Sequence, residues 1–178
     1  MTQSELFTAP WDHRLTVITV VVSSIMALGA GAALWAGLTV APSWPARIVT
    51  LGGAALTVVI FLSGFLLAPR GYTIADGRLT IDRYLRPIEI PLASISAVEP
   101  LPAQSVSGAL RTLGSGGFFG YYGRFRNRAL GSFRMYATRG DGYVLVRAAK
   151  PYVLTPDSPQ RFIETLNRDR AAAGSGGR

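Results

Sequence analysis

The sequence predicts two membrane-spanning helices followed by a mainly-β, α+β domain in which antiparallel strands are closed by one C-terminal amphipathic helix. Two apolar stretches, residues 16–46 and 48–69, contain no charged side chain and are separated by Arg47 alone. After Pro69, apolar and polar residues alternate as they do in half-buried strands. We therefore divide the chain into four parts: an N-terminal tail at 1–14, a transmembrane hairpin at 15–68, a water-facing domain at 69–170 and a flexible tail at 171–178.

The first span is expected at about residues 15–38. A helix needs roughly 20 apolar residues to cross a hydrocarbon core of about 30 Å, and this stretch is long enough. Trp11 lies before it, and Trp35 and Trp44 lie near its far end, as in the aromatic belts of spanning helices. A cleaved signal peptide, the alternative, has an apolar region of only about 7–15 residues, so we expect a retained helix.

The second span is expected at about residues 48–68. Pro42 and Pro45 interrupt the helical pattern and leave a short turn over residues 39–47. The second helix then runs antiparallel to the first, and both ends of the chain lie on one side.

Basic residues near the spans predict the orientation. Four arginines follow the second span closely, whereas the turn holds only Arg47. The positive-inside rule therefore places the large domain and both termini in the cytoplasm, in a multi-pass protein of the cell (inner) membrane. The four arginines are Arg70, Arg78, Arg83 and Arg86.

Small residues line parts of both spans. Gly29, Ala33 and Gly37 recur every four residues on one face of the first helix, and Gly52 and Gly53 lie early in the second. Close contact between the two helices explains them, and so does the ordinary abundance of small residues in membrane helices.

The clearest strand signals open the domain. Residues 72–75 and 78–83 alternate and are joined by Asp76-Gly77, a dipeptide that favours a two-residue type I′ turn. Residues 87–91 predict a third short strand, whose prolines favour an edge or a strand end. Residues 95–98 predict a short turn or helix.

The second half of the domain is expected to end in a helix. Residues 129–138 and 143–148 predict another hairpin, and residues 152–155 a last strand. Ser158 can then cap a helix, and Pro159 at its first position needs no partner for a backbone N–H. Its apolar face is formed by Phe162, Ile163 and Leu166.

Several short motifs follow one another in a familiar order across residues 69–170. They are residues 72–81, 88–95, 116–122, 130–133 and 152–163. This order resembles the pleckstrin-homology (PH) superfold, and in particular the bacterial PH-like domains attached to membrane hairpins. The resemblance implies a binding module without an assigned biochemical activity.

The resemblance does not carry over phosphoinositide binding. Eukaryotic PH domains typically bind these lipids with a long basic loop between their first two strands. Here the Asp76-Gly77 turn stands at that position.

An unusual segment, residues 111–134, alternates arginines with glycines and aromatic residues. No acidic residue lies between Pro100 and Arg139, so these cations face water, lipid phosphate or an acidic partner. We take this segment as the candidate lipid- or partner-binding site. Its candidate residues are Arg111, Phe118, Phe119, Tyr121, Tyr122, Arg124, Arg126 and Arg128.

Three interpretations of this segment remain open. The arginines can bind an anionic leaflet while residues 118–122 enter the headgroups. Alternatively, the segment packs on its own sheet, with its aromatic side chains buried and its arginines solvated. Arginine between aromatic rings also binds single-stranded nucleic acid. We rank this third alternative last and expect no nucleic-acid partner.

The composition argues against catalysis. The chain has no cysteine and one histidine, His13, so we expect no metal site. Neither an acid/base pair nor a nucleophile with its base is visible, and residues 114–117 lack the lysine of a phosphate loop. We therefore expect no catalytic residues and no cofactor.

We expect a membrane-tethered module that works by binding. Its predicted partner at the cytoplasmic face is a protein or a second copy of the chain, engaged through an exposed sheet edge that can accept an added strand. The alternative function is recognition of anionic lipid headgroups by residues 111–134.

Overall fold

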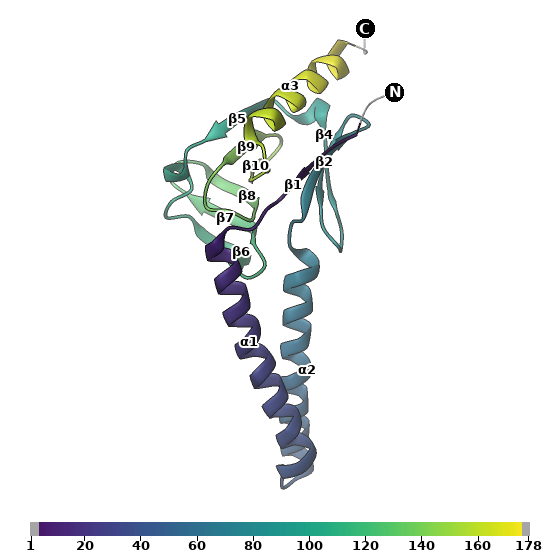
Figure 1. Cartoon of the computed structure of the whole chain (residues 1–178), viewed down its shortest axis with the longest axis vertical. Coiled ribbons are helices and arrows are strands. Elements are labelled where there is room, and N and C mark those ends of the chain that lie inside the picture. Colours follow the sequence, from purple (N-terminus) through teal and green to yellow (C-terminus); the bar gives the residue numbers. More distant parts are fainter. Residues whose placement is uncertain (1–3, 176–178) are drawn as a thin grey trace.

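The computed structural model describes residues 4–175 and contains a helical hairpin with a strand-rich domain at one end (Figure 1). Helix α1 (His13–Trp35) continues into a π-helical segment, η1 (Ala36–Val40), and helix α2 (Trp44–Leu67) returns beside it. The connection is only residues 41–43, shorter than expected, because Pro45 lies in the first turn of α2. A proline is tolerated there, since the first N–H groups of a helix have no intrahelical partner.

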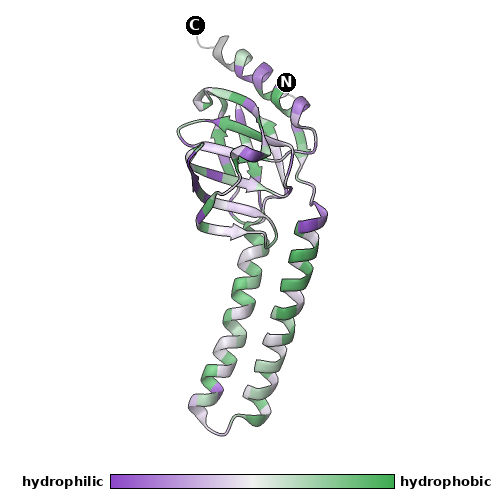
Figure 2. Cartoon of the chain, turned by 90° about the vertical axis from the view of Figure 1, so that its left-hand side faces the viewer, coloured by the Kyte–Doolittle hydropathy of each residue, from purple (hydrophilic) through white to green (hydrophobic). Residues whose placement is uncertain are grey.

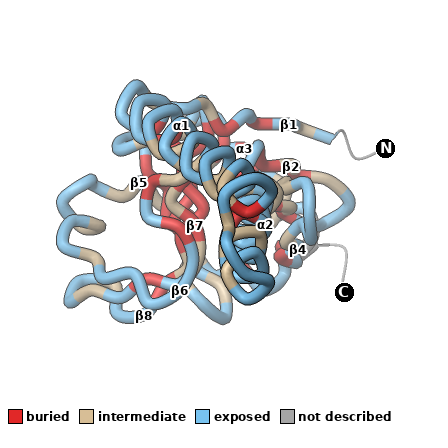
Figure 3. Tube along the Cα trace, turned by 90° about the horizontal axis from the view of Figure 1, so that it is seen from below, coloured by how far each residue is buried: buried red, intermediate tan, exposed pale blue. Residues whose placement is uncertain are grey.

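Both helices are long and apolar enough to cross a membrane. They are 28 residues, counting η1, and 24 residues long. Their apolar side chains are mostly exposed instead of buried in a protein core (Figures 2 and 3). The two helices are therefore candidate membrane spans.

The helices touch closely near their connection. A Cβ atom at Gly37 would lie 2.7–2.8 Å from side-chain atoms of Thr50 and Leu51, so a larger residue would require these side chains to move. Gly29, Gly52 and Gly53 have nothing within 4 Å of such an atom. Close helix contact therefore explains Gly37 and leaves the other three as ordinary small residues.

A four-stranded sheet begins with a strand that the sequence analysis missed. The strand order is β1-β2-β3-β4, and every neighbouring pair is antiparallel. Strand β1 lies within the predicted N-terminal tail, so the helical hairpin is inserted between two paired strands. The strands are β1 (Glu5–Thr8), β2 (Gly71–Ala75), β3 (Arg78–Asp82) and β4 (Ile88–Pro91).

The insertion changes which loop lies between the first two strands. The connection from β1 to β2 is the helical hairpin itself, whereas Asp76-Gly77 joins β2 to β3. Asp76 and Gly77 both have positive φ angles, as a type I′ turn requires.

A second sheet has six strands in the order β5-β9-β10-β8-β7-β6. Residues 95–98, expected as a turn or helix, instead lead into strand β5, and a short 3-10 helix, η2 (Leu92–Ser94), lies just before them; another 3-10 helix, η3 (Ala103–Ser105), follows β5. The strands are β5 (Ala97–Leu101), β6 (Leu110–Gly116), β7 (Tyr121–Asn127), β8 (Gly131–Ala137), β9 (Tyr143–Arg147) and β10 (Pro151–Leu154).

The predicted hairpin between β8 and β9 is wrong. Strand β10 lies between them, antiparallel to β9 and parallel to β8. Hydrogen bonds hold the end of β8 against the segment after β10: Thr138 N–H donates to Thr155 Oγ1 (2.9 Å), and Arg139 donates to the Pro156 carbonyl (3.1 Å). Sequence spacing alone does not reveal such long-range pairing.

Helix α3 (Pro159–Ser175) closes the domain. Phe162 and Leu166 are fully buried in a core that includes residues from both sheets, and Ile163 packs at its margin. The helix continues beyond residue 170, where a flexible tail was expected, and residues 176–178 lie outside the described part of the chain.

Tyr72 joins the two sheets inside this core. Its hydroxyl donates to the Tyr136 carbonyl (2.6 Å) and accepts from Thr155 N–H (3.1 Å). Complete burial raises the pKa of Tyr72 to about 12, so it remains a neutral donor.

Candidate functional site

The tip of the β6–β7 hairpin, residues 117–120, lies between the two helices at their domain end. Phe119 is buried, and its N–H donates to Thr19 Oγ1 on α1 (3.2 Å). Its ring makes edge contacts with Phe61 and Phe65 on α2, at centroid distances of 5.4 and 5.5 Å. We call residues 117–120 the wedge, because they contact both helices.

Phe118 extends the same contact. A Cβ atom at Gly64 on α2 would lie 2.8 Å from the Phe118 ring, so the small glycine admits this side chain. Phe118 and Phe61 also meet edge to face, with centroids 6.0 Å apart. The sequence singled out both phenylalanines without indicating that the helices are their partners.

Tyr122 and Tyr121 follow the wedge on β7. Tyr122 is buried and donates its hydroxyl to the Gly64 carbonyl (2.8 Å), whereas Tyr121 is half-buried. Burial raises the pKa of both hydroxyls. Both tyrosines therefore remain uncharged at neutral pH.

The four predicted arginines lie further along the strands and in the turn after β7. All are exposed: Arg111, Arg124, Arg126 and Arg128. None belongs to the ion pairs formed among residues 4–175. The structure thus separates the predicted site into a buried aromatic part and an exposed cationic part.

Strand β6 is one edge of the six-stranded sheet. It pairs with β7 on one side, and residues 110–114 are all exposed. Leu110 and Leu113 are 75% and 62% exposed, which is unusual for large apolar side chains on a strand. The opposite edge, β5, contacts α3 and is partly covered.

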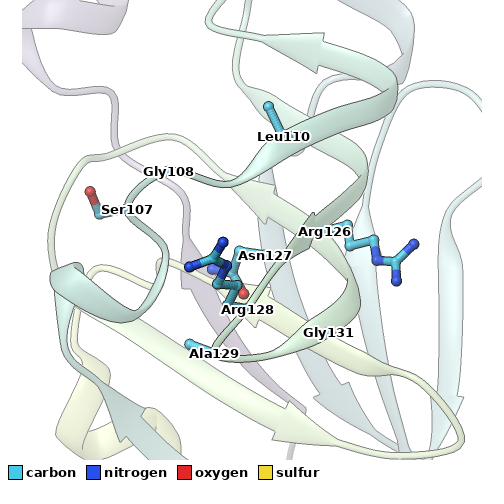
Figure 4. Close-up of a pocket in the computed structure, with 8 residues that line it drawn as sticks. All are labelled: Ser107, Gly108, Leu110, Arg126, Asn127, Arg128, Ala129 and Gly131. Carbon is cyan, nitrogen blue, oxygen red and sulfur yellow. The ribbon is translucent and has the colours of Figure 1, made fainter.

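A cavity of about 760 Å³ opens at the far end of β6 and β7 (Figure 4). Two arginines line it, but Arg126 and Arg128 point in different directions in Figure 4. Its geometry therefore brings no pair of cations onto one ligand. Its lining residues are Ser107, Gly108, Leu110, Arg126, Asn127, Arg128, Ala129 and Gly131.

A third group of residues was not singled out as a site from the sequence. Arg83 and Arg134 lie beside Tyr136 and Tyr152, in the space where the two sheets face each other. Arg83 reaches this place from the β3–β4 loop, far from Arg134 in sequence. The lack of acidic residues around Arg134 was visible in the sequence, but the approach of Arg83 was not.

Two sheets closed by one C-terminal helix, with a cationic surface, describe a binding module of the PH type. The model of the bacterial PH domain family matches residues 70–170, and the chain belongs to this family. PH-like domains are generally non-catalytic binding modules. No curated protein matches the chain, and no solved structure matches it. Strand β1 lies outside the matched range yet completes the first sheet.

Proposed function

We propose that this protein is anchored in the cell membrane by α1 and α2 and that its domain binds an extended acidic segment of a partner protein at the cytoplasmic face. The exposed apolar surfaces of the helices support the anchor. Residues before α1 and after α2 lie at the same end of the hairpin, because β1 pairs with β2. The arginines that follow α2 then face the cytoplasm by the positive-inside rule.

The open edge of β6 carries this proposal. An unpaired edge strand presents free N–H and C=O groups to an added strand. Natural proteins usually protect such edges against pairing. Leu110 and Leu113 are exposed instead, so this edge is unprotected and apolar. A bound strand would pair with the backbone and cover both leucines.

The charges around the edge favour an acidic partner. Arg111, Arg126 and Arg128 have no carboxylate among their described ion-pair partners. Two β6 strands meeting edge to edge would bring the Arg111 side chains of the two copies onto facing strands, and like charges on facing strands are destabilising. We therefore favour a different protein over a second copy of this chain.

Site-specific photo-crosslinking in cells tests this proposal. A photoreactive amino acid replaces Leu113 in the full chain, and mass spectrometry locates the attached segment. We expect an acidic, extended peptide of another protein, and we expect Leu110→Asp to reduce the adduct at least about tenfold by charge repulsion. Ala129→Asp is the matched control, since Ala129 is exposed in the β7–β8 turn.

A different set of adducts would refute the proposal. Dimers of the chain alone would indicate self-association, and adducts with phospholipid alone would indicate a lipid-facing edge. An adduct that Leu110→Asp and Ala129→Asp reduce equally would show that the partner binds elsewhere.

Anionic lipid remains a second candidate ligand for the same segment. One observation favours it: β6 is the strand of its sheet nearest to the helices (Figure 1), and the wedge after it reaches Thr19. Each basic residue near an anionic leaflet contributes about 1 kcal/mol. The phospholipid adduct described above is the result that this candidate predicts.

A further inference from the structure

We infer that Arg83, Arg124 and Arg134 form a phosphate-binding site between the two sheets. This site is separate from the β6 edge and does not depend on the partner proposed there. Two sources can supply the phosphate, a lipid headgroup or a soluble phosphate compound, and the experiment below distinguishes them.

Two of the three arginines lie over a stacked pair of tyrosine rings. The Arg83 guanidinium lies 5.6 Å from the centre of the Tyr136 ring, and that of Arg134 lies 5.6 Å from the centre of the Tyr152 ring. The two rings stack on each other with centroids 6.5 Å apart. Burial raises the pKa of Tyr136, while the charges of Arg83, Arg134 and Arg124 act on it in the opposite direction. The guanidinium groups of Arg83 and Arg134 therefore lie at adjacent, stacked tyrosine rings.

Arg83 forms no ion pair with a carboxylate among the described residues. It is half-buried, and its buried Nε has no hydrogen-bond partner among the described residues. Burial lowers the pKa of its guanidinium. Within residues 4–175, the guanidinium makes one hydrogen bond, from Nη2 to the Arg86 carbonyl. Burying a charge is costly unless a partner compensates it, so this position favours an anion.

Three carboxylates on strands of the two sheets have partners outside the cluster. Asp82, next in sequence to Arg83, accepts a hydrogen bond from the Thr73 hydroxyl (2.7 Å). Glu89 pairs with Arg78, and Glu99 pairs with Arg147. None of these three carboxylates makes an ion pair with the cluster.

Arg124 and Arg134 add a second unusual arrangement. They stand directly opposite each other on the antiparallel strands β7 and β8, so their side chains share one face. Like charges at such positions repel, and an anion bound between them would turn this repulsion into attraction. A cavity of about 350 Å³ lies beside them, lined also by Thr112, Ser132 and Lys150.

Phosphate suits this group better than a carboxylate does. Each guanidinium offers five N–H donors in a planar arrangement. The donors of three guanidinium groups need more acceptor oxygens than the two that a carboxylate provides. A phosphate group supplies three or more oxygens and pairs with arginine in bidentate geometry.

The position of the cluster favours a headgroup source. The Leu85 N–H, two residues after Arg83, donates to the Leu66 carbonyl in the last turn of α2 (3.0 Å). Tyr122, which pairs across the strands with Tyr136, donates to Gly64. The residues that flank the cluster therefore contact the domain end of a candidate span, where lipid phosphates lie.

Lipid nanodiscs containing the full chain test the inference. The thermal unfolding midpoint and lipid retention in native mass spectrometry are compared in three bilayers: phosphatidylcholine alone, and the same bilayer with phosphatidic acid or with phosphatidylserine. Inorganic pyrophosphate is titrated into the phosphatidylcholine sample as the soluble arm. We expect phosphatidic acid to raise the midpoint and to be retained most strongly, since its phosphate is the least hindered.

Two variants that lose the same number of positive charges distinguish a specific phosphate site from general electrostatic attraction. In the triple variant Arg83→Gln, Arg124→Gln and Arg134→Gln we expect affinity to fall by about tenfold or more per lost guanidinium contact. The matched triple Arg111→Gln, Arg126→Gln and Arg128→Gln should retain the phosphatidic acid effect. If the first triple does not fold, the double variant Arg124→Gln and Arg134→Gln replaces it.

Three outcomes are decisive for the phosphate site. Equal losses in both triples would mean diffuse electrostatics and would overturn the site. No response to either phosphatidic acid or pyrophosphate would overturn it as well. Stabilisation by pyrophosphate alone would keep the site and assign it to a soluble phosphate compound. If the photoreactive residue at position 113 forms no adduct with another protein while the phosphatidic acid response is intact, only the partner proposal is refuted.

Discussion

The two parts of residues 111–134 differ in their surroundings, although they have similar compositions of arginine, glycine and aromatic residues. The wedge and Tyr122 are held by α1 and α2, whereas Arg111, Arg124 and Arg126 remain exposed on the strands. The comparison shows that one segment has two different environments. Its aromatic part contacts the hairpin, and its arginines are exposed to solvent.

Removing the Phe119 ring should have the largest effect on the contact between the domain and the helices. Phe119→Ala deletes a buried ring that packs against Phe61 and Phe65 of α2 and against Trp11 just before α1, and truncations of this kind cost about 3–5 kcal/mol. We expect a clearly lower thermal unfolding midpoint in detergent and faster proteolysis after Pro69. Leu113→Ala is the matched control, because Leu113 is exposed and its loss should change the midpoint little. Equal effects of both substitutions would contradict the attachment role.

Gly64→Ala tests the same contact from the side of the helix. The added methyl group would lie 2.8 Å from the Phe118 ring, and overpacking of this kind typically costs about 1–3 kcal/mol. Gly53→Ala on the same helix meets nothing within 4 Å and should be tolerated. The unfolding midpoints of the two variants in detergent provide the measurement. A Gly64→Ala protein as stable as Gly53→Ala would show that the wedge is loosely seated.

A smaller effect is expected at Tyr122. Tyr122→Phe keeps the ring and removes the hydrogen bond to the Gly64 carbonyl, which is worth about 0.5–1.5 kcal/mol. Chemical denaturation monitored by tryptophan fluorescence measures the loss, because Trp11 lies 6.0 Å from the Phe119 ring. Tyr121→Phe should be closer to neutral, since the Tyr121 hydroxyl makes no hydrogen bond within residues 4–175. A larger loss at Tyr121 would contradict this ranking.

The sequence predicted the helical hairpin because continuous apolar stretches carry a strong local signal. It also predicted the Asp76-Gly77 turn and the closing helix, whose residues have local conformational preferences. Strand β1 was not predicted, because four residues before a span are too few to show a clear alternation of apolar and polar side chains. Its pairing with β2 depends on residues more than 60 positions away.

The candidate site also has a part that the sequence predicts and a part that it does not. Exposed arginines could be predicted from the missing carboxylates, because charge is a property of composition. The seating of Phe118 against Gly64 could not, since it needs the positions of α2 and the β6–β7 tip together. Arg83 was noticed only as a cation near the membrane, because its approach to Tyr136 results from the meeting of two sheets.

The two sheet edges β1 and β6 differ in how far α3 covers them, and this difference leads to a last, smaller prediction. Glu5 on β1 accepts hydrogen bonds from Arg168 (2.9 Å) and Thr165 (3.1 Å) of α3, so the helix covers this edge, whereas β6 has no such cover. The bond from Arg168 lowers the pKa of Glu5 below its ordinary value of 4.5. A lowered folded-state pKa means that its contribution is present above pH 4.5 and is lost as the pH falls through the folded-state value.

Glu5→Gln removes this pH-dependent contribution. We expect the variant to be slightly less stable than the parent at pH 7 and to lose the difference near pH 3, measured by unfolding midpoints at both values. Exposed pairs contribute about 0–1 kcal/mol, and salt should weaken the effect. Glu99→Gln, which removes a pairing with Arg147 between neighbouring strands, is the control for charge loss without loss of edge cover. If only Glu5→Gln increases proteolysis near β1, then α3 protects that edge through Glu5, and the unprotected β6 is the edge left for a partner.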